Sequence, residues 1–358
     1  MKYIIDKSNG KAYLQLYEQI KNDIVNGVYK FNSKLPSKRI LSEETGASII
    51  TVEHAYSLLC EEGYVDSRER SGYFVSFNPD NTFVSAALQN TNFSHQHTIV
   101  HNDGFPFSTY AKTVRKVLGE YGEDIFSLSN GSGCDELKSA ICNYLNRSRG
   151  INVKKEQIVV GAGSEYLYGL IVQMLGKNRI YALEDPSYPK IAKVYRANGV
   201  KTLFLPLLND GISSEYLQKT PATVLHITPY RSYPSRISAS ASKKREYIEW
   251  AKKANKIIVE DDYESEFTLL KKAEETVFSL SGGNNVIYVN TFSKTVSPAI
   301  RIAYMIIPET MISLYEESVG FYNCSVPLFN QLILAEFIES GNFERHINRV
   351  RRKARRSQ

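Results

Sequence analysis

The sequence predicts a large α/β domain with a mostly parallel sheet, preceded by a small domain of three helices and a β-ribbon. From about residue 103 onward, helical patterns alternate with short β-branched runs. Such alternation is typical of parallel strands joined by helices. Before residue 77, apolar residues recur at helical spacing between clear capping residues, and two short apolar runs close the segment.

Three helices are expected in the first 60 residues. Apolar residues recur every four positions over 12–26, and Gly27 ends that pattern. Ser37 is a suitable N-cap for a second helix that Gly46 closes, and Ser48 is a suitable N-cap for a third. The apolar faces consist of Leu16, Ile20 and Ile24 in the first helix and of Val52, Ala55, Tyr56 and Leu59 in the third.

A β-ribbon is expected after the third helix. The apolar runs 64–65 and 73–75 frame a polar turn at 66–72. Three helices with such a ribbon form a winged helix-turn-helix, which we expect over residues 10–76 as a DNA-binding domain. Residues 77–102 are polar and aperiodic, which predicts a linker.

The remaining residues, 103–358, are expected to form the α/β domain. Seven runs rich in apolar and β-branched residues predict its strands. They are residues 157–160, 179–183, 202–206, 223–227, 256–259, 286–290 and 303–307. We find no internal repeat.

Composition excludes several classes of protein. The chain has 358 residues, 42% of them hydrophobic and 23% charged, as in ordinary globular proteins. No apolar stretch approaches the roughly 18 residues of a membrane span, and there is no signal-peptide core. The four cysteines have neither metal-ligand spacing nor the density of a disulfide framework. We therefore expect a cytoplasmic protein with no metal site and no membrane association.

The net charge of +6 is concentrated at one end of the chain. Residues 344–358 contain seven Lys/Arg and one Glu, which accounts for the whole excess. Residues 1–75 contain ten basic and ten acidic side chains. Binding to DNA must therefore depend on the placement of charges. For the basic stretch 345–356 we expect a solvated helix face, and the alternative is nonspecific binding of nucleic acid.

The predicted strand ends carry groups that suit an aldehyde cofactor. Lys294 follows the strand 286–290, and Asp261 ends another strand, at the edge where sheet sites open. The turn 161–165 leads from a strand into a helix, so its N–H groups can hold a phosphate. Tyr188 can stack on a flat ring. Each feature alone also suits a solvated lysine or an ordinary turn, but their joint order predicts a cofactor site.

On these motifs the larger domain resembles the fold-type I aminotransferases. Together with the N-terminal domain, the chain is similar to the MocR/GabR-type transcriptional regulators. The resemblance implies pyridoxal 5'-phosphate as the cofactor, with Lys294 bonded to it as a Schiff base and Asp261 at its ring nitrogen. The other implied contacts are Tyr263 to the ring hydroxyl, Tyr188 stacked on the ring, and Ser164, Glu165 (through its backbone), Thr291, Ser293 and Arg301 around the phosphate.

The chain departs from this family at two places. Arg236 stands where a glycine is common, so we expect a local distortion or a changed ligand contact there. The chain ends soon after Arg349, whereas relatives continue into a small domain that supplies an arginine for the substrate carboxylate. We therefore expect the small domain to be largely missing and efficient turnover to be absent. The cations that remain as weak candidates near the site are Lys190, Arg231 and Arg236.

Residues 13–75 resemble the GntR-type winged helix, most specifically in the run Leu-Pro-Ser-Lys-Arg at 35–39. The resemblance implies that this run contacts DNA phosphates and that helix 48–59 enters the major groove. Gly72 permits the bend of the wing, which would touch the adjacent groove. The DNA-contacting residues that we expect are Ser37, Lys38, Arg39, Ser48, Thr51, Arg68, Arg70 and Gly72.

The recognition helix also departs from its relatives. Ile49 stands where they usually have an arginine, the residue best suited to read guanine. Ile49 and Ile50 therefore contact either thymine methyl groups or a neighbouring protein surface. The alternative to DNA binding is a winged helix used for protein contact or dimerisation.

The leading interpretation is a transcriptional regulator that depends on pyridoxal phosphate. It binds double-stranded DNA as a homodimer and senses pyridoxal phosphate or an amino compound through an aminotransferase-like domain. One alternative is an active aminotransferase with an accessory winged helix, which turnover of amino acids would reveal. The other is a degenerate, truncated regulator that folds poorly, which thermal melting with and without the cofactor would reveal.

Overall fold

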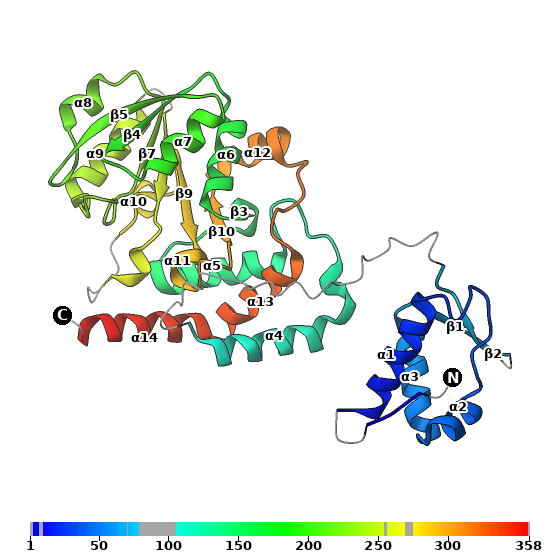
Figure 1. Cartoon of the computed structure of the whole chain (residues 1–358). Coiled ribbons are helices and arrows are strands. Elements are labelled where there is room, and N and C mark those ends of the chain that lie inside the picture. Colours follow the sequence, from blue (N-terminus) through cyan, green and yellow to red (C-terminus); the bar gives the residue numbers. More distant parts are fainter. Residues whose placement is uncertain are drawn as a thin grey trace. The chain divides into compact units, whose positions relative to one another are not determined.

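The computed structural model describes residues 3–6, 10–69, 71–78, 105–253, 256–268 and 275–356. The chain forms two compact units, Met1–Ile99 and Val100–Gln358 (Figure 1). Most of the expected linker 77–102 lies outside the described residues. Among those described, no helix is long and apolar enough to cross a membrane, and no group of His, Cys, Asp and Glu side chains suits a metal ion.

The first unit contains the expected winged helix-turn-helix. Its helices are α1 (Ala12–Val25), α2 (Lys38–Thr45) and α3 (Ile49–Glu61), and its ribbon consists of β1 (Val65–Arg68) and β2 (Gly72–Val75). The apolar positions that recur in the sequence form one core between these elements. The fully buried side chains of that core include Leu16, Ile20, Ile24, Leu41, Val52, Tyr56 and Leu59.

Capping residues fix the bounds of α2 and α3. The Ser37 hydroxyl accepts a hydrogen bond from the Ile40 N–H, and the Ser48 hydroxyl accepts one from the Thr51 N–H, at 3.3 and 3.1 Å. Gly46 ends α2 with a φ of 67°, a left-handed conformation that favours glycine. These three caps confirm the helix-turn-helix that was predicted from the sequence.

The wing is more extended than predicted. Its strands pair from Val65 with Val75 to Arg68 with Gly72, so they include residues that we expected in the turn. The Arg68 guanidinium lies 4.3 Å from the centre of the Phe74 ring, an attractive cation–π distance. Arg68 therefore also stabilises the ribbon, while Arg70 lies outside the described residues.

The second unit contains an eight-stranded sheet within its described residues. The strand order is β3-β10-β9-β8-β7-β4-β5-β6. Pairing is parallel from β9 through β8, β7 and β4 to β5, and antiparallel on both sides of β10 and between β5 and β6. The mostly parallel sheet is thus confirmed. Its strands are β3 (Ile158–Gly161), β4 (Ile180–Asp185), β5 (Lys201–Leu208), β6 (Gly211–Ile212), β7 (Val224–Ile227), β8 (Ile257–Asp261), β9 (Val286–Thr291) and β10 (Ala303–Ile306).

Helices cover both faces of this sheet, as parallel strands require. Alternate strand residues face opposite sides, so Ile258 and Tyr288 pack in one core cluster, and Val259 and Val289 in the other. The helices are α4 (Phe107–Tyr121), α5 (Asp135–Arg149), α6 (Ser164–Leu175), α7 (Pro189–Ala197), α8 (Ser214–Lys219), α9 (Ala241–Lys252), α10 (Val277–Ser281), α11 (Phe292–Thr295), α12 (Ile312–Val319), α13 (Leu328–Glu339) and α14 (Asn342–Arg356). Single 3₁₀ turns lie at Gly122–Phe126, Lys155–Gln157, Ser265–Phe267 and Glu309–Met311.

Side chains from α6, α7 and α12 pack against one face of the sheet, and side chains from α5, α9, α10 and α13 pack against the other. The C-terminal helix α14, red in Figure 1, includes the basic stretch 345–356. Phe343, His346 and Ile347 are buried on its inner side, and its last turns are exposed.

A buried ion cluster joins α5 to the segment that follows β8. The Arg149 guanidinium lies 3.3 Å from the Asp262 carboxylate and 3.8 Å from that of Glu266, and all three side chains are almost completely buried. Tyr288 donates a hydrogen bond to Asp262, and Asn290 donates one to Glu266. Burial raises the pKa of Glu266. Arg149 is thus the cation that compensates two acidic groups in a dry environment.

Replacing Arg149 with Met is expected to destabilise this unit by about 3–5 kcal/mol, because it leaves buried carboxyl groups without their cation. Urea unfolding of the full chain measures the change. The matched control is Arg147→Met on the same helix, where a surface pair with Glu344 is lost and a change of at most about 1 kcal/mol is expected. Equal losses in the two variants would contradict the assignment.

Candidate functional site

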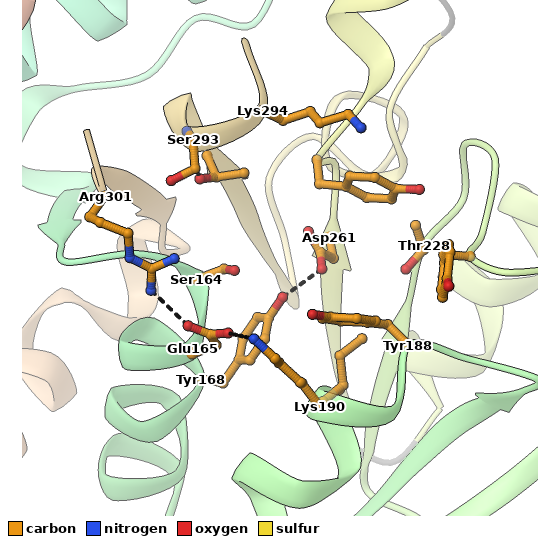
Figure 2. A pocket seen from close by; sticks show the side chains of 14 residues that line it. Ser164, Glu165, Tyr168, Tyr188, Lys190, Thr228, Asp261, Ser293, Lys294 and Arg301 are labelled. Atoms are coloured by element: carbon orange, nitrogen blue, oxygen red, sulfur yellow. Dashed lines mark hydrogen bonds and ion pairs between the residues drawn. The ribbon is translucent and has the colours of Figure 1, made fainter. Parts of the chain in front are cut away.

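A cavity of about 330 Å³ opens where the carboxyl ends of several parallel strands meet. Thr228 follows β7, Asp261 ends β8 and Thr291 ends β9. All nine residues that the sequence predicted for a cofactor line this one cavity (Figure 2). They are Ser164, Glu165, Tyr188, Asp261, Tyr263, Thr291, Ser293, Lys294 and Arg301, and they are joined by Tyr168, Lys190, Ile191, Thr228 and Tyr233.

Lys294 lies on the short helix α11, directly after β9. The Thr291 hydroxyl caps this helix by accepting a hydrogen bond from the Ser293 N–H at 3.1 Å. The Lys294 side chain is exposed to solvent and lines the cavity. Its amine is therefore accessible to a small molecule that enters the cavity.

Asp261 is buried and oriented by a neighbouring tyrosine. The Tyr168 hydroxyl donates a hydrogen bond of 2.5 Å to the Asp261 carboxylate, and the His226 Nε2 atom lies 3.8 Å from the same oxygen. His226 in turn forms a hydrogen bond through Nδ1 with the Tyr195 hydroxyl, at 2.8 Å. Burial raises the pKa of Tyr168 well above its ordinary value, so Tyr168 stays a neutral donor. This arrangement holds one carboxylate in a fixed direction.

Tyr168, His226 and Tyr195 are not among the residues predicted from the sequence. A signal for Tyr168 was present, because it lies four residues after Ser164 on α6, and such residues share a helix face. His226 on β7 and Tyr195 on α7 carry no comparable signal. Their approach to Asp261 depends on the order of the strands in the sheet.

The N-terminus of α6 and Arg301 lie together at one corner of the cavity. Gly163 precedes α6 with a φ of 97°, and a Cβ atom there would lie 2.8 Å from a nitrogen of the Arg301 guanidinium. The backbone conformation at Gly163, with φ 97° and ψ 162°, is essentially restricted to glycine, and the absence of a Cβ atom lets the guanidinium approach closely. The Ser293 hydroxyl oxygen is buried and has no hydrogen-bond partner in the described structure. Together with the free N–H groups of a helix start, this corner suits a phosphate.

Glu165, for which the sequence predicted a backbone contact, places its side chain at this corner. Figure 2 shows its carboxylate between two cations, with Arg301 at 2.7 Å and Lys190 at 3.2 Å. The hydrogen bond from Arg301, and then that from Lys190, lowers the pKa of Glu165. The carboxylate is therefore ionised at neutral pH and holds both cations at the cavity.

Two aromatic rings form part of the cavity wall. Tyr188 and Tyr233 meet edge to face, with ring centres 5.8 Å apart, and both side chains are about half exposed. The Tyr263 hydroxyl donates a hydrogen bond to the Arg231 carbonyl oxygen at 3.2 Å. This hydrogen bond holds Tyr263 at the cavity wall, where it can contact the ring of a bound molecule.

The backbone around Arg236 keeps a glycine-like conformation. Its φ is 62°, so the arginine occupies the left-handed region that a glycine would adopt. The Arg236 guanidinium lies 3.6 Å from the Glu264 carboxylate. Among the three cations expected near the site, only Lys190 lines the cavity.

Some of the residues expected to contact DNA are exposed, and others already have partners within the domain. Arg39 is exposed on the first turn of α2, next to the Ser37 cap. Lys38, by contrast, is paired with Glu53 of α3 at 2.6 Å, and the Thr51 hydroxyl lies 2.9 Å from that of Ser48. At the wing, Gly72 has a φ of 109°. Several expected contacts are therefore also engaged within the domain itself.

Comparisons with known proteins follow the same division. The profile of the bacterial regulatory proteins of the gntR family matches residues 12–75. The profile of aminotransferase class I and II matches residues 103–358. The two profiles define the class, a helix-turn-helix domain joined to an aminotransferase-like domain.

Named relatives have the same organisation. The HTH-type transcriptional regulator YdeL of Bacillus subtilis is 32% identical over 96% of this chain and 77% of its own length. The probable rhizopine catabolism regulatory protein MocR of Rhizobium meliloti is 28% identical over 94% and 74%. The pyridoxine biosynthesis regulator PdxR of Corynebacterium glutamicum is 27% identical over 94% and 75%. The chain belongs to this family of HTH-type transcriptional regulators with an aminotransferase class I and II domain.

Solved structures confirm the fold of the larger domain. A multiple substrate aminotransferase from Thermococcus profundus has a TM-score of 0.65 and 22% identity, over 72% of this chain and 66% of its own. An archaeal alanine:glyoxylate aminotransferase has a TM-score of 0.63 and 20% identity, over 68% and 63%. The chain thus spans just under two thirds of the length of these enzymes. At this identity the similarity concerns the fold.

Gly163→Ala is expected to destabilise the protein by about as much as Gly176→Ala. Both glycines combine positive φ with extended ψ, a region that is essentially restricted to glycine, so each variant loses about 1–3 kcal/mol from backbone strain. A Cβ atom at residue 163 meets the end of the Arg301 side chain, which is more than half exposed and can move aside, and nothing lies within 4 Å of one at residue 176. The two losses, measured as differences in the free energy of unfolding, should therefore agree within about 1 kcal/mol. A much larger loss in Gly163→Ala would contradict a movable Arg301 side chain.

Proposed function

We propose that this regulator binds pyridoxal 5'-phosphate in the cavity of its aminotransferase-like domain (residues 103–358) and operator DNA through its winged helix (10–76), as a homodimer. The effector is pyridoxal phosphate itself or an amino compound that reacts with it. The observation that carries the proposal is the convergence of Lys294, Asp261 and Arg301 on one cavity.

The chemical groups that line the cavity fit this cofactor. Lys294 supplies an accessible amine for the aldehyde, and the buried Asp261 carboxylate can hold a protonated ring nitrogen. Arg301, the start of α6 and the unpartnered Ser293 hydroxyl suit the phosphate group. Tyr188 offers a ring for stacking, and Tyr263 a hydroxyl near the cofactor ring.

Phosphate binding would also change the partners of Glu165. A dianion beside Arg301 competes with the Glu165 carboxylate for that cation, because two like charges cannot share it without loss. Lys190, the second partner of Glu165, lies on the first turn of α7. Binding of a phosphate beside Arg301 would therefore change the ion pairs that Glu165 makes with Arg301 and Lys190. A change of this kind on binding suits a sensor.

When bound, pyridoxal phosphate supplies an aldehyde that combines reversibly with primary amines. This chain's residues would orient the ring, exclude water from the Asp261 side and keep the ring nitrogen protonated. Two relatives are named for regulating pyridoxine biosynthesis and rhizopine catabolism. The first of these names supports a compound of the pyridoxine class, such as the cofactor itself, as the effector here.

Reduction with borohydride in the presence of pyridoxal phosphate tests the site directly. We expect one pyridoxyl group per chain, located on Lys294 by peptide mass spectrometry, and its loss in Lys294→Ala. Lys193→Ala, an exposed lysine of α7 that does not line the cavity, serves as the control and is expected to label fully. Folded wild-type protein that takes up no label would contradict cofactor binding.

Incubation of the loaded protein with amino acids separates sensing from catalysis. For a sensor we expect that the amino acid alone changes the cofactor spectrum fully. Addition of a keto acid should then cause no continued conversion of amino acid. Continued conversion of amino acid to keto acid at enzyme-like rates, above about 1 s⁻¹, would favour the alternative of an active aminotransferase.

Arg39→Ala is expected to weaken binding to DNA by a similar factor for every sequence, because an arginine at the start of α2 contacts phosphate rather than bases. The slope of log affinity against log salt should fall by about 0.9, the value for one lost phosphate contact. Filter binding over a salt series measures it. The control is Lys30→Ala, an exposed lysine outside the helix-turn-helix, which should leave the slope unchanged. An unchanged slope in Arg39→Ala would contradict this contact.

A further inference from the structure

The outward face of α3 begins with two exposed isoleucines. Val52, Ala55, Tyr56 and Leu59 are buried in the core of the first unit, and this fixes which side of the helix faces outward. Ile49 and Ile50 are 46% and 67% exposed in its first turn. In a helix-turn-helix, this turn is the part that approaches the base edges of the major groove.

The polar groups of the same turns are already engaged. α3 (Ile49–Glu61) contains no Arg or Lys. The Glu53 carboxylate is paired with Lys38 at 2.6 Å, and the hydrogen bond from Lys38 lowers the pKa of Glu53. Glu53 therefore stays ionised and already has a partner. The Thr51 hydroxyl is 2.9 Å from that of Ser48, and the His54 ring packs edge-on against Tyr13 at 5.7 Å. In the first two turns of α3, the two isoleucine side chains are thus the exposed groups that are left to contact base edges.

We infer that Ile49 and Ile50 read the 5-methyl groups of thymine, so that operator half-sites carry thymines beneath the first turn of α3. Thymine is the base that presents a methyl group in the major groove, and apolar side chains recognise it by contact. Bidentate recognition of guanine needs an arginine or lysine, which this helix lacks. The inference rests on the proposed DNA binding and adds its sequence preference.

The occupant of this apolar surface is DNA rather than another apolar surface for two reasons. The two isoleucines continue directly from the Ser48 cap, and α2 presents the exposed Arg39 in its own first turn, which suits a phosphate backbone. The gntR-family profile also covers the whole of this unit's helix-turn-helix. A protein contact through the isoleucines remains an outcome that the experiment below detects.

Exchange of thymine for uracil isolates the methyl group, because the two bases differ only there. The full chain, loaded with pyridoxal phosphate, selects duplexes from a random-sequence library at about 50 mM salt. Each thymine of the selected duplex is then replaced singly by dU, and affinities are measured at fixed salt. At the contacted positions we expect a loss of about fourfold per methyl group, which corresponds to about 0.8 kcal/mol per buried carbon.

Variants complete a thermodynamic cycle. Ile50→Ala and Ile49→Ala should bind the thymine duplex less tightly, and the penalty for dU at the contacted position should then vanish. Both side chains are exposed, so little loss of fold stability is expected. The matched control is Val25→Ala, which shortens an apolar side chain as exposed as that of Ile49, at the end of α1, and should leave the dU penalty intact.

The outcomes separate the two proposals. Tight binding that ignores dU at every position, or an equal dU penalty in wild type and the Ile variants, overturns methyl reading and leaves DNA binding in place. A change of oligomeric state in Ile50→Ala without any dU effect assigns the surface to a protein contact and also overturns it. If no duplex is selected at all, DNA binding itself fails, and methyl reading fails with it.

Discussion

The candidate cofactor site depends on the parallel pairing of β8 with β9 and of both with β7. Parallel neighbours end at the same edge, so Asp261 at the end of β8 and Lys294 just after β9 are brought to one cavity. The pairing register is fixed by burial on both faces, since a slip of one residue would move every side chain of β8 to the opposite face. The helices that bury those faces are therefore as necessary to the site as its lining residues.

Charge is used differently in the scaffold and in the cavity. Arg149 is almost completely buried with Asp262 and Glu266, where removing one partner leaves an uncompensated charge. Arg301 and Lys190 are instead more than half exposed and share the carboxylate of Glu165. Exposed pairs of this kind contribute little to stability and exchange partners readily. The first arrangement suits a rigid frame, and the second suits a site whose occupant changes.

The winged-helix unit has no net positive charge, and some of its cations are used within the fold. Its residues 1–75 are neutral overall, and Lys38 and Arg68 make contacts within the fold. The start of α2, with the exposed Arg39 in its first turn, is where a phosphate can be bound by oriented N–H groups and a cation. Affinity for DNA in such a domain would come from the geometry of its contacts rather than from a strong electrostatic field.

The sequence by itself determined the local structure and the order of the chemical groups. Caps such as Ser37 and Gly46, the seven main strand runs, and the placement of Lys294 and Asp261 after strands follow from periodicity and residue type, which act over a few residues. Only the tertiary structure decided that Tyr168 and His226 meet Asp261, and that the Glu165 side chain joins Arg301 to Lys190. These contacts join residues far apart in the chain, and they depend on strand order, register and side-chain rotamers, none of which a local pattern encodes.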